Sequence, residues 1–202
     1  MLVISSREWF KRKRNRLKRI ERDKRIGYFD EKIDELVNHI NRLPDYSTTS
    51  SCSGRIIFYD SDAPWGFDHG DVLAKTHDLV AEEYLRQILQ KEAKRILWAS
   101  AQGPIVHVAC RDISSANWLN KMARRVGFKH GGVISLEEEV VVELRAVDRV
   151  DIPLKRGDIV IVNDLKIVAE ILNSVLIKGW NIMSRFCDIL AKIDEYEYLR
   201  EK

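Results

Sequence analysis

The stretch from Leu165 to about Tyr196 constrains the fold most, because its apolar residues recur with the 3.6-residue period of one helix face. Asn163 or Asp164 can cap its start with a side-chain oxygen. Gly179 lies in its middle, where glycine costs about 1 kcal/mol relative to alanine, so a bend or a close packing contact is expected there. The pattern predicts one long C-terminal helix. Its apolar positions are Ile167, Val168, Ile171, Leu172, Val175, Leu176, Trp180, Met183, Phe186 and Leu190.

The rest of the chain alternates shorter helical patterns with strand-like segments. Apolar residues at helical spacing predict three further helices, near residues 33–40, 79–91 and 118–126. Ser114 or Ser115 can cap the last of these. Segments rich in β-branched and aromatic residues predict strands at residues 56–59, 72–76, 96–99 and 105–109, and four more between residues 132 and 162.

These elements together predict a mixed α/β fold of the α+β kind, with a largely antiparallel sheet, three main helices and the long C-terminal helix. The strands fall into hairpin-like groups between the helices. A doubly wound dinucleotide fold requires G-x-G-x-x-G between its first strand and helix, and that spacing is absent. The phosphate-binding pattern G-x-x-x-x-G-K-[ST] is absent as well. We therefore expect a fold other than the Rossmann fold.

Length and cysteine content indicate a reduced cytoplasmic protein. A chain of 202 residues can bury roughly 70% of its unfolded surface, so it needs no disulfide or metal to fold. Its longest apolar run falls short of the roughly 20 residues that span a membrane, and its N-terminus lacks the apolar core of a secretory signal. The three cysteines, Cys52, Cys110 and Cys187, form no C-x-x-C pair. Neither a membrane segment nor a metal site is expected.

Positive charge is concentrated at the N-terminus. Residues 1–25 contain eleven lysines and arginines against three acidic residues, whereas the whole chain has a net charge of only +3. Such asymmetry is typical of an arm that binds a polyanion such as nucleic acid, although a solvated charged helix or a nuclear-import-like run has the same composition. The sequence predicts a basic N-terminal arm or helix over residues 1–29, followed by a single compact domain over residues 30–202.

The stretch T-T-S-S-C-S-G-R at residues 48–55 gathers small polar side chains just before an apolar strand. Backbone amides in a glycine-containing turn, together with hydroxyl groups and one guanidinium, can bind a carboxylate or a phosphate. Gly54 permits a close backbone approach and Arg55 offers a bidentate fork. A hydroxyl-rich connection between helix and strand has the same composition, so both interpretations stay open.

Other residues of chemical interest lie at the ends of predicted strands. His77 follows a short strand, and His107 lies in the apolar segment I-V-H-V-A-C-R, where a buried structural histidine is equally compatible with the sequence. Cys52 and Cys110 can be small packing residues. Trp65 and Phe67 lie in a polar loop, where aromatic rings can stack on bases.

No Ser-His-Asp order, paired carboxylates or H-E-x-x-H pattern is evident. The residues alone therefore predict a nucleic-acid-binding protein with a basic arm and a candidate anion or cofactor loop. Two alternatives remain. A non-catalytic RNA-binding module would grip phosphate with the Ser/Gly loop and bind no cofactor. A phosphoryl-transfer or hydrolytic enzyme would use the same loop with acidic metal ligands, and Asp60, Asp62, Asp68 and Asp71 lie nearby at irregular spacing.

Several ordered motifs together resemble the tRNA wybutosine-synthesising protein 3 methyltransferases. The signature-like T-T-S-S-C-S-G-R-I comes first, followed by Gly66-Phe67, Thr76-His77, H-V-x-C-R at 107–111 and M-A-x-x-x-G-F-K at 122–129. A final A-V-x-x-x-x-x-I-P-L strand and the C-terminal helix complete the resemblance, which covers roughly residues 8–200. The family often has Ser-Gly where this chain has Gly131-Gly132.

The resemblance implies a compact non-Rossmann α/β fold and S-adenosylmethionine as methyl donor. It implies transfer of the methyl group to a ring nitrogen of 7-aminocarboxypropyl-demethylwyosine, on the 3′ side of the tRNA(Phe) anticodon. A base in an anticodon loop is splayed into a pocket at lower cost than one in a duplex. The basic arm would contact tRNA phosphates.

The resemblance also matches individual residues that are expected to line one cleft: Ser50, Ser51, Ser53, Gly54, Arg55, His77, His107, Arg111 and Phe128. In this cleft, His77 is the expected base for the proton of the substrate ring nitrogen, because imidazole titrates near neutral pH. The 50–55 loop would bind a carboxylate, either that of the cofactor or that of the substrate side chain. The expected catalytic residues are His77, His107 and Arg111; the cofactor-binding residues are Ser50, Ser51, Ser53, Gly54 and Arg55; the substrate-binding residues are Thr76, Phe128, Lys129, Arg12, Arg14 and Arg16.

Overall fold

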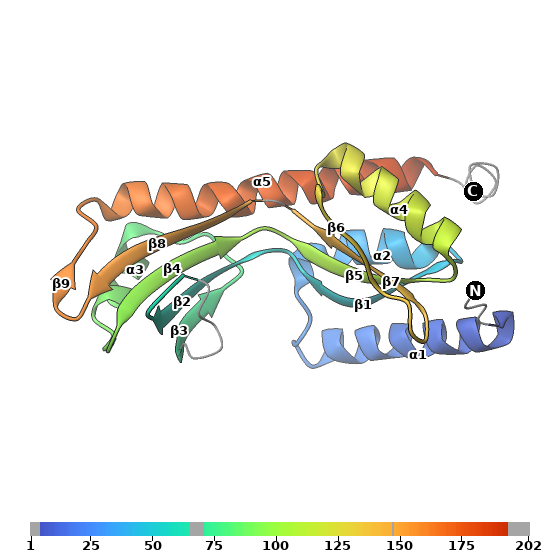
Figure 1. Cartoon of the computed structure of the whole chain (residues 1–202), viewed down its shortest axis with the longest axis horizontal. Helices are drawn as coiled ribbons and strands as arrows, with labels where there is room; N and C mark the ends of the chain where they lie inside the picture. Colours follow the sequence, from blue (N-terminus) through green and yellow to red (C-terminus); the bar gives the residue numbers. More distant parts are fainter. Residues whose placement is uncertain (1–4, 65–70, 147, 194–202) are drawn as a thin grey trace. The chain divides into compact units, whose positions relative to one another are not determined.

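A computed structural model describes residues 5–64, 71–146 and 148–193 of the chain (Figure 1). Contacts between Cα atoms group these residues into two compact units. Unit 1 contains the described residues of 5–53, 104–146 and 181–193, and unit 2 contains those of 54–103 and 148–180. Every strand pairing is antiparallel. The predicted α+β fold is confirmed, and the single domain over residues 30–202 stays a prediction.

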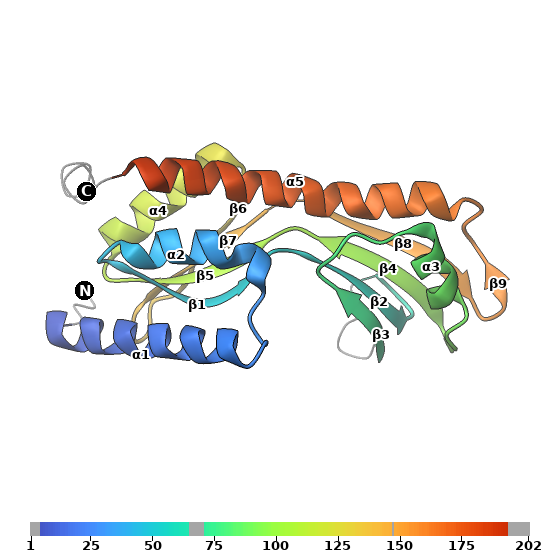
Figure 2. The same cartoon turned by 180° about the vertical axis from the view of Figure 1, so that it is seen from behind.

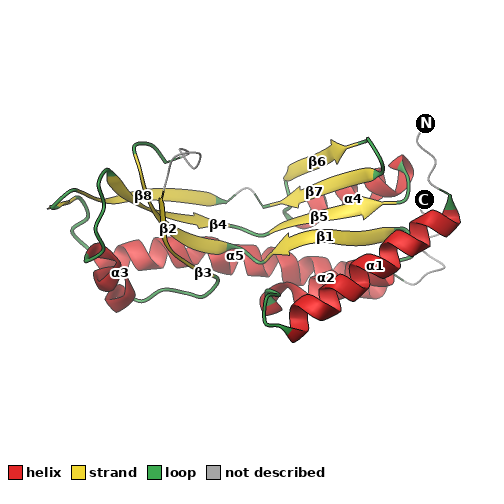
Figure 3. Ribbon diagram, turned by 90° about the horizontal axis from the view of Figure 1, so that it is seen from below, coloured by secondary structure: helices red, strands yellow, loops and turns green. Residues whose placement is uncertain are grey.

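Unit 1 is built on a four-stranded sheet with the order β1-β5-β7-β6 (Figure 3). The strands are β1 (Tyr46–Cys52), β5 (Ile105–Cys110), β6 (His130–Ser135) and β7 (Val140–Arg145). Alternate residues of a strand face opposite sides of a sheet, and in β5 the residues Val106, Val108 and Cys110 are fully buried on one side. His107 belongs to the other side and is partly exposed.

Helices border both faces of this sheet. They are α1 (Ser6–Arg25), the short 3-10 helix η1 (Glu31–Ile33), α2 (Asp34–Arg42), α4 (Ile113–Val126) and the second part of α5 (Leu165–Lys192). Helices α2 and α4 lie on one side of the sheet, and α1 runs along the β1 edge on the other side (Figures 1 and 2). Asp112 caps α4, because the backbone N–H of Ser115 donates to its Oδ1 at 2.7 Å. The predicted caps Ser114 and Ser115 are therefore wrong by two or three residues.

The predicted loop over residues 48–55 is wrong for most of its length, because β1 continues through Cys52. Sequence composition predicts a loop, but Thr48, Thr49 and Ser50 of the strand have hydrogen-bond partners in α2 or β5, whereas the buried hydroxyl of Ser47 has none among the described residues. Thr48 is buried, its N–H donates to Asn41 Oδ1 at 2.9 Å, and its Oγ1 accepts from Asn41 Nδ2 at 2.8 Å. Thr48 is thus accommodated in a buried strand because both its N–H and its hydroxyl bond to Asn41.

Unit 2 contains a five-stranded sheet with the order β3-β2-β4-β8-β9. The elements are β2 (Arg55–Ser61), β3 (Asp71–Thr76), α3 (Glu82–Leu89), β4 (Ile96–Gln102), β8 (Arg149–Arg156), β9 (Ile159–Val160) and the first part of α5. One apolar core joins the sheet to both helices, with Phe58 from β2, Leu85 from α3 and Leu172 from α5 all fully buried. The strand segments predicted at 56–59, 72–76 and 96–99 are confirmed.

The predicted long C-terminal helix is confirmed as α5, which runs without interruption from Leu165 to Lys192. The backbone N–H of Ile167 donates to Asp164 Oδ1 at 3.0 Å, so Asp164 caps its start as expected. The predicted end near Tyr196 lies outside the described residues. Among the helices that the structure describes, none is long and apolar enough to cross a membrane.

A buried lysine attaches helix α1 to the segment before β1, within unit 1. Lys13 is 8% exposed, and its ammonium donates to the carbonyl oxygen of Leu43 and, at 3.5 Å, to that of Pro44. Burial lowers the pKa of Lys13 from 10.5 to about 8, and the charge of Asp45 only partly opposes this shift. The cost of burying a charged amine therefore falls on the folded state below about pH 8.

As the pH increases from about 8 to 10.5, we expect the free energy of unfolding of the wild type to rise relative to that of a Lys13→Met variant. In this window the folded protein has released the proton of Lys13, whereas the unfolded chain still binds it, so higher pH favours the folded state. The upper limit is about 3 kcal/mol over the window. Urea titrations at several pH values measure it, with exposed Lys11→Met as the control. Parallel pH curves for the wild type and Lys13→Met would contradict the assignment.

Candidate functional site

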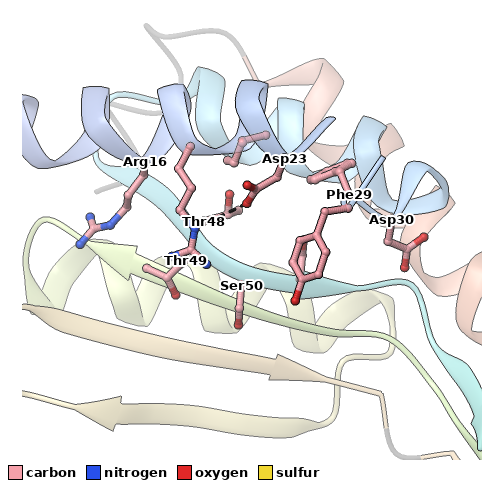
Figure 4. Close-up of a pocket in the computed structure, with 11 residues that line it drawn as sticks. Arg16, Asp23, Phe29, Asp30, Thr48, Thr49 and Ser50 are labelled. Atoms are coloured by element: carbon pink, nitrogen blue, oxygen red, sulfur yellow. Dashed lines mark ion pairs between the residues drawn. The ribbon is translucent and has the colours of Figure 1, made fainter. Parts of the chain in front are cut away.

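A pocket of about 300 Å³ lies in unit 1, between helix α1, the loop that follows it and strand β1 (Figure 4). Such a volume is at the lower end of the range for small-ligand sites. Strand β1 contributes four consecutive residues of the Ser/Thr-rich motif at 48–55, which the sequence predicts to bind an anion or a cofactor. The lining residues are Arg16, Arg19, Ile20, Asp23, Tyr28, Phe29, Asp30, Thr48, Thr49, Ser50 and Ser51.

The helix side of the pocket carries charge, and the loop side carries aromatic rings. Arg19 Nε lies 3.5 Å from Asp23 Oδ2, and the Arg19 side chain is 66% exposed. The amine of Lys24 lies 5.1 Å from the centre of the Phe29 ring, within the range of a cation–π contact. Tyr28 is 81% exposed at the rim. A ligand with charged and flat parts can find complementary groups in this pocket.

Asp30 connects the pocket to the end of the Ser/Thr-rich motif. Its Oδ1 caps η1 by accepting from the N–H of Lys32 at 3.2 Å, and its Oδ2 accepts from the N–H of Ser53 at 2.7 Å. Ser53 is fully buried, so the predicted cofactor ligand offers no exposed hydroxyl in this conformation. The Ser53 amide is already bonded to a carboxylate and the Thr48 hydroxyl to Asn41, which leaves Thr49, Ser50 and Ser51 as the other β1 hydroxyl residues at the pocket.

Ser50 takes part in a chain of side chains across three neighbouring strands. Ser50 Oγ lies 3.1 Å from His107 Nδ1, and His107 Nε2 lies 3.1 Å from Glu143 Oε2. The strands β1, β5 and β7 supply one residue each, and the register pairs Ser50 with His107 and His107 with Glu143. The predicted proximity of Ser50 and His107 is therefore found, whereas Glu143 was not anticipated.

A β-bulge brings Ser50 to this position. The β1–β5 register shifts between Thr48 and Ser50, so Thr49 is the additional residue and Ser50, rather than Thr49, pairs with His107. The Thr49 hydroxyl donates to the carbonyl oxygen of His107 at 3.3 Å, which ties the bulge to β5. Bulges of this kind often re-aim a side chain next to a functional site.

The predicted arginines of α1 have different surroundings. Arg12 contacts Glu8 at 3.1 Å and Glu138 at 3.3 Å, and Arg16 forms an ion pair with Glu139. The hydrogen bond with Glu8 is the main cause that raises the pKa of Arg12. Arg14, by contrast, is exposed and has no ion pair with the residues that the structure describes.

Arg14 belongs to a row of cations on the outer face of α1, which we call the basic stripe. Its members follow one another at spacings of three or four residues, so they share one helix face. The opposite face is buried through Trp9, whose Nε1 donates to the carbonyl oxygen of Pro44 at 2.9 Å. The basic stripe consists of Arg7, Lys11, Arg14, Lys18, Arg22 and Arg25, and all six are exposed.

Three other predicted residues of unit 1 have structural partners. Arg111 donates to Ser6 Oγ at 2.8 Å and to Asp45 Oδ1 at 3.3 Å, so it ties the start of α1 to the start of β1. Phe128 is 1% exposed and its ring packs on Phe186 at 5.7 Å, which places it in the core. Lys129 is exposed directly after Phe128.

The remaining predicted residues belong to unit 2. His77 Nδ1 lies 2.7 Å from the carbonyl oxygen of Gly54, so Nδ1 carries the proton in this bond and the lone pair of the neutral ring is at Nε2. Gly54 has a φ of +104°, and a Cβ there would lie 2.8 Å from the carbonyl oxygen of Gln102, so glycine is required. Arg55 is exposed, and Thr76 ends β3. Trp65, Gly66, Phe67 and Asp68 lie outside the described residues.

The pocket residues fit the polar end of S-adenosylmethionine. That end carries a carboxylate and an ammonium, for which Arg19, Asp23 and the β1 hydroxyl groups are complementary partners. A 3-amino-3-carboxypropyl side chain carries the same two charges, so the residues of the pocket suit either ligand.

The antiparallel sheets and the polar pocket define a class of α+β protein distinct from the doubly wound nucleotide-binding enzymes. A family model described as Methyltransferase TYW3 matches residues 11–192, and the chain belongs to this family of methyltransferases. The resemblance inferred from the ordered motifs is thereby confirmed.

Curated relatives and solved structures agree with this assignment. The chain is 33% identical over 187 residues to the tRNA(Phe) 7-((3-amino-3-carboxypropyl)-4-demethylwyosine(37)-N(4))-methyltransferase of Saccharolobus solfataricus, covering 91% of this chain and 90% of the relative. A relative of the same name from Archaeoglobus fulgidus is 32% identical over 183 residues, covering 86% and 92%. A solved structure of a Pyrococcus horikoshii protein matches with a TM-score of 0.86 and 27% identity, over 94% of this chain and 98% of that chain.

Proposed function

We propose that this protein methylates a ring nitrogen of 7-aminocarboxypropyl-demethylwyosine, on the 3′ side of the tRNA(Phe) anticodon, with S-adenosylmethionine as donor and in the cytoplasm. The observation that carries the proposal is the 33% identity, over nine tenths of both chains, to a relative named for this reaction on tRNA(Phe). The pocket supports it, because its charged and hydroxyl groups suit a ligand with an amino-acid end.

When bound, S-adenosylmethionine supplies a methyl group that its sulfonium already activates. The protein's part is then to position the ring nitrogen in line with that group and to accept the nitrogen's proton. Ser50 and Ser51 line the pocket and stay the proposed cofactor contacts in unit 1, with Gly54 and Arg55 proposed in unit 2. Thr76 and Lys129 stay proposed substrate contacts.

The basic stripe is the proposed contact for tRNA phosphates. Its six side chains are exposed on one helix face, where Lys11 and Arg22, among the residues that the structure describes, pair only with Glu8 and Asp23 of the same helix, whereas Arg12 and Arg16 also pair with glutamates next to β7. Phosphate contacts dominate the affinity of proteins for nucleic acids, and they require cations that can reach the surface of the partner. Of the three arginines predicted for this role, Arg14 therefore suits it best.

We expect the purified protein to transfer one methyl group from S-adenosylmethionine to tRNA(Phe) that carries the aminocarboxypropyl intermediate. Transfer of radiolabelled methyl, followed by mass spectrometry of the digested nucleosides, measures it. Unmodified tRNA(Phe) transcript is the matched control and should accept no methyl group, because it lacks the tricyclic ring. Binding of tRNA without binding of S-adenosylmethionine in calorimetry would instead favour the alternative of a non-catalytic RNA-binding module.

A further inference from the structure

The row of Ser50, His107 and Glu143 carries an inference about how the proton leaves the substrate. Both nitrogens of the His107 ring have a polar partner at 3.1 Å, one on each neighbouring strand. The side chains of His107 and Glu143 are 31% and 19% exposed, so the row is partly shielded from water. Ser50 also lines the pocket, which places one end of the row at the ligand site.

The chemistry of the three groups fixes the direction of the hydrogen bonds. An ionised carboxylate only accepts, so Glu143 takes the hydrogen of His107 Nε2–H. The neutral ring then has its lone pair at Nδ1, and the Ser50 hydroxyl must donate to it. The hydroxyl hydrogen of Ser50 points to His107. The Ser50 oxygen therefore presents only its lone pairs to any other partner. Ser50 is thus set to accept a hydrogen bond.

We propose that Ser50, His107 and Glu143 form a proton relay that accepts the ring proton of the nucleobase during methylation. This inference rests on the proposed function. The substrate nitrogen loses its hydrogen to Ser50 Oγ and keeps the electron pair of the N–H bond, which forms the new bond to the methyl carbon. The hydroxyl proton of Ser50 moves to His107 Nδ1, and the electron pair of the broken carbon–sulfur bond stays on sulfur. The imidazolium later releases its proton to solvent.

Glu143 acts in this relay as a positioning residue. Its carboxylate fixes the His107 tautomer and stabilises the imidazolium that forms, without touching the substrate. The charged groups around the relay are Arg145 on β7, whose Nε lies 3.7 Å from Glu143 Oε1, and the pocket residues Arg16, Arg19, Asp23 and Asp30. Only the carboxylate of Glu143 is in direct contact with the ring of His107 among these described groups.

The tautomer can be tested without cofactor or tRNA. In the ¹⁵N NMR spectrum of histidine-labelled protein at pH 8, we expect His107 to show a protonated Nε2 and an unprotonated Nδ1, with the signal assigned by its loss in His107→Asn. Glu143→Gln should change this pattern, because the amide can donate as well as accept. The exposed Glu137→Gln on the β6–β7 connection is the control and should leave the spectrum unchanged. A protonated Nδ1 in the wild type would overturn the relay.

Single-turnover methylation at saturating cofactor tests the chemistry. Ser50→Ala and His107→Asn should lower the rate about 10²–10³-fold, the usual range for a lost proton acceptor. Glu143→Gln should lower it about 10–100-fold and move the rising limb of the pH–rate profile to lower pH, because the proton bound by His107 loses its carboxylate partner. Calorimetry is the second readout, and it should show S-adenosylmethionine affinity within about threefold of wild type in His107→Asn and Glu143→Gln, because neither residue lines the pocket.

The outcomes separate the relay from the proposed function and from the predicted base. Wild-type protein that transfers no methyl group would refute the proposed function. Wild-type activity together with normal rates for Ser50→Ala and Glu143→Gln would refute the relay alone. A large loss in His77→Ala, with none in His107→Asn, would assign the base to His77. A Ser50→Ala variant with weakened cofactor binding and a normal rate would make Ser50 a cofactor ligand.

Discussion

Replacing four cations of the basic stripe with glutamine is expected to weaken binding of tRNA by up to about 10³-fold at 0.1 M salt. The variant Arg7→Gln/Lys11→Gln/Arg14→Gln/Lys18→Gln removes charges that are exposed on one face of α1. Each phosphate contact contributes roughly 0.7–0.9 to the slope of log affinity against log salt, so four lost contacts should flatten this slope by about 3. Filter binding or fluorescence anisotropy over a salt series measures both quantities.

A matched variant tests whether position, rather than net charge, is responsible. Lys91→Gln/Lys94→Gln/Arg156→Gln/Lys166→Gln removes the same number of exposed cations from unit 2 and should change the slope by less than 1. Deleting residues 1–25 would be a poorer experiment, since it would also remove Trp9 and Lys13, which are buried. If both quadruple variants lowered affinity and slope equally, the basic stripe would be an ordinary solvated helix face.

The long C-terminal helix was predictable because its signal is strong and repeated. Ten apolar residues at a helical period predict the helix almost independently of the rest of the chain, although two of them, Ile167 and Ile171, are exposed rather than part of the buried face of α5. The Ser/Thr-rich strand β1 shows the opposite case. Serine and threonine satisfy their hydroxyl groups equally well in turns and in sheets, so only the buried contact of Thr48 with Asn41 decides between them.

The candidate site was predictable in its residue types and only partly in its geometry. Ser50 and His107 were predicted as site residues because they lie in segments that resemble motifs of the family. Their contact, however, depends on the bulge at Thr49, which no local sequence pattern indicates. Glu143 alternates with the buried Val142 and Leu144, and this pattern does predict that it faces the other side of the sheet. Its contact with His107 requires the strand register as well.

The basic segment shows how a helical projection would have improved the prediction. Charge counting treats Arg12, Arg14 and Arg16 alike. Once α1 is a helix with Trp9 on its buried face, Arg14 falls on the opposite side, whereas Arg12 and Arg16 reach the glutamates before β7. Their ion pairs with Glu138 and Glu139 could not be read from the sequence, because these partners lie more than 120 residues away, whereas the pair of Arg12 with Glu8 follows from the spacing of four residues on one helix.

The second large effect concerns the glycine pair in β6. Gly131→Ala is expected to lower the free energy of unfolding by about 3–5 kcal/mol. Gly131 has a φ of +126°, which a residue with a Cβ adopts only with strain of about 1–3 kcal/mol. A Cβ there would also overlap the carbonyl oxygen of Glu143 and lie 2.9 Å from its carbonyl carbon, and these are backbone atoms of the neighbouring strand that cannot rotate away.

The adjacent glycine provides the control within the same strand. Gly132 has a φ of +153° and open space where its Cβ would lie, so Gly132→Ala should cost only about 1–2 kcal/mol. The difference between the two variants in urea unfolding isolates the overlap with β7. Because Glu143 lies at this overlap, Gly131→Ala should also disturb the His107 signal in the ¹⁵N spectrum, whereas Gly132→Ala should not. Equal stability losses in the two variants would show that β6 moves freely relative to β7.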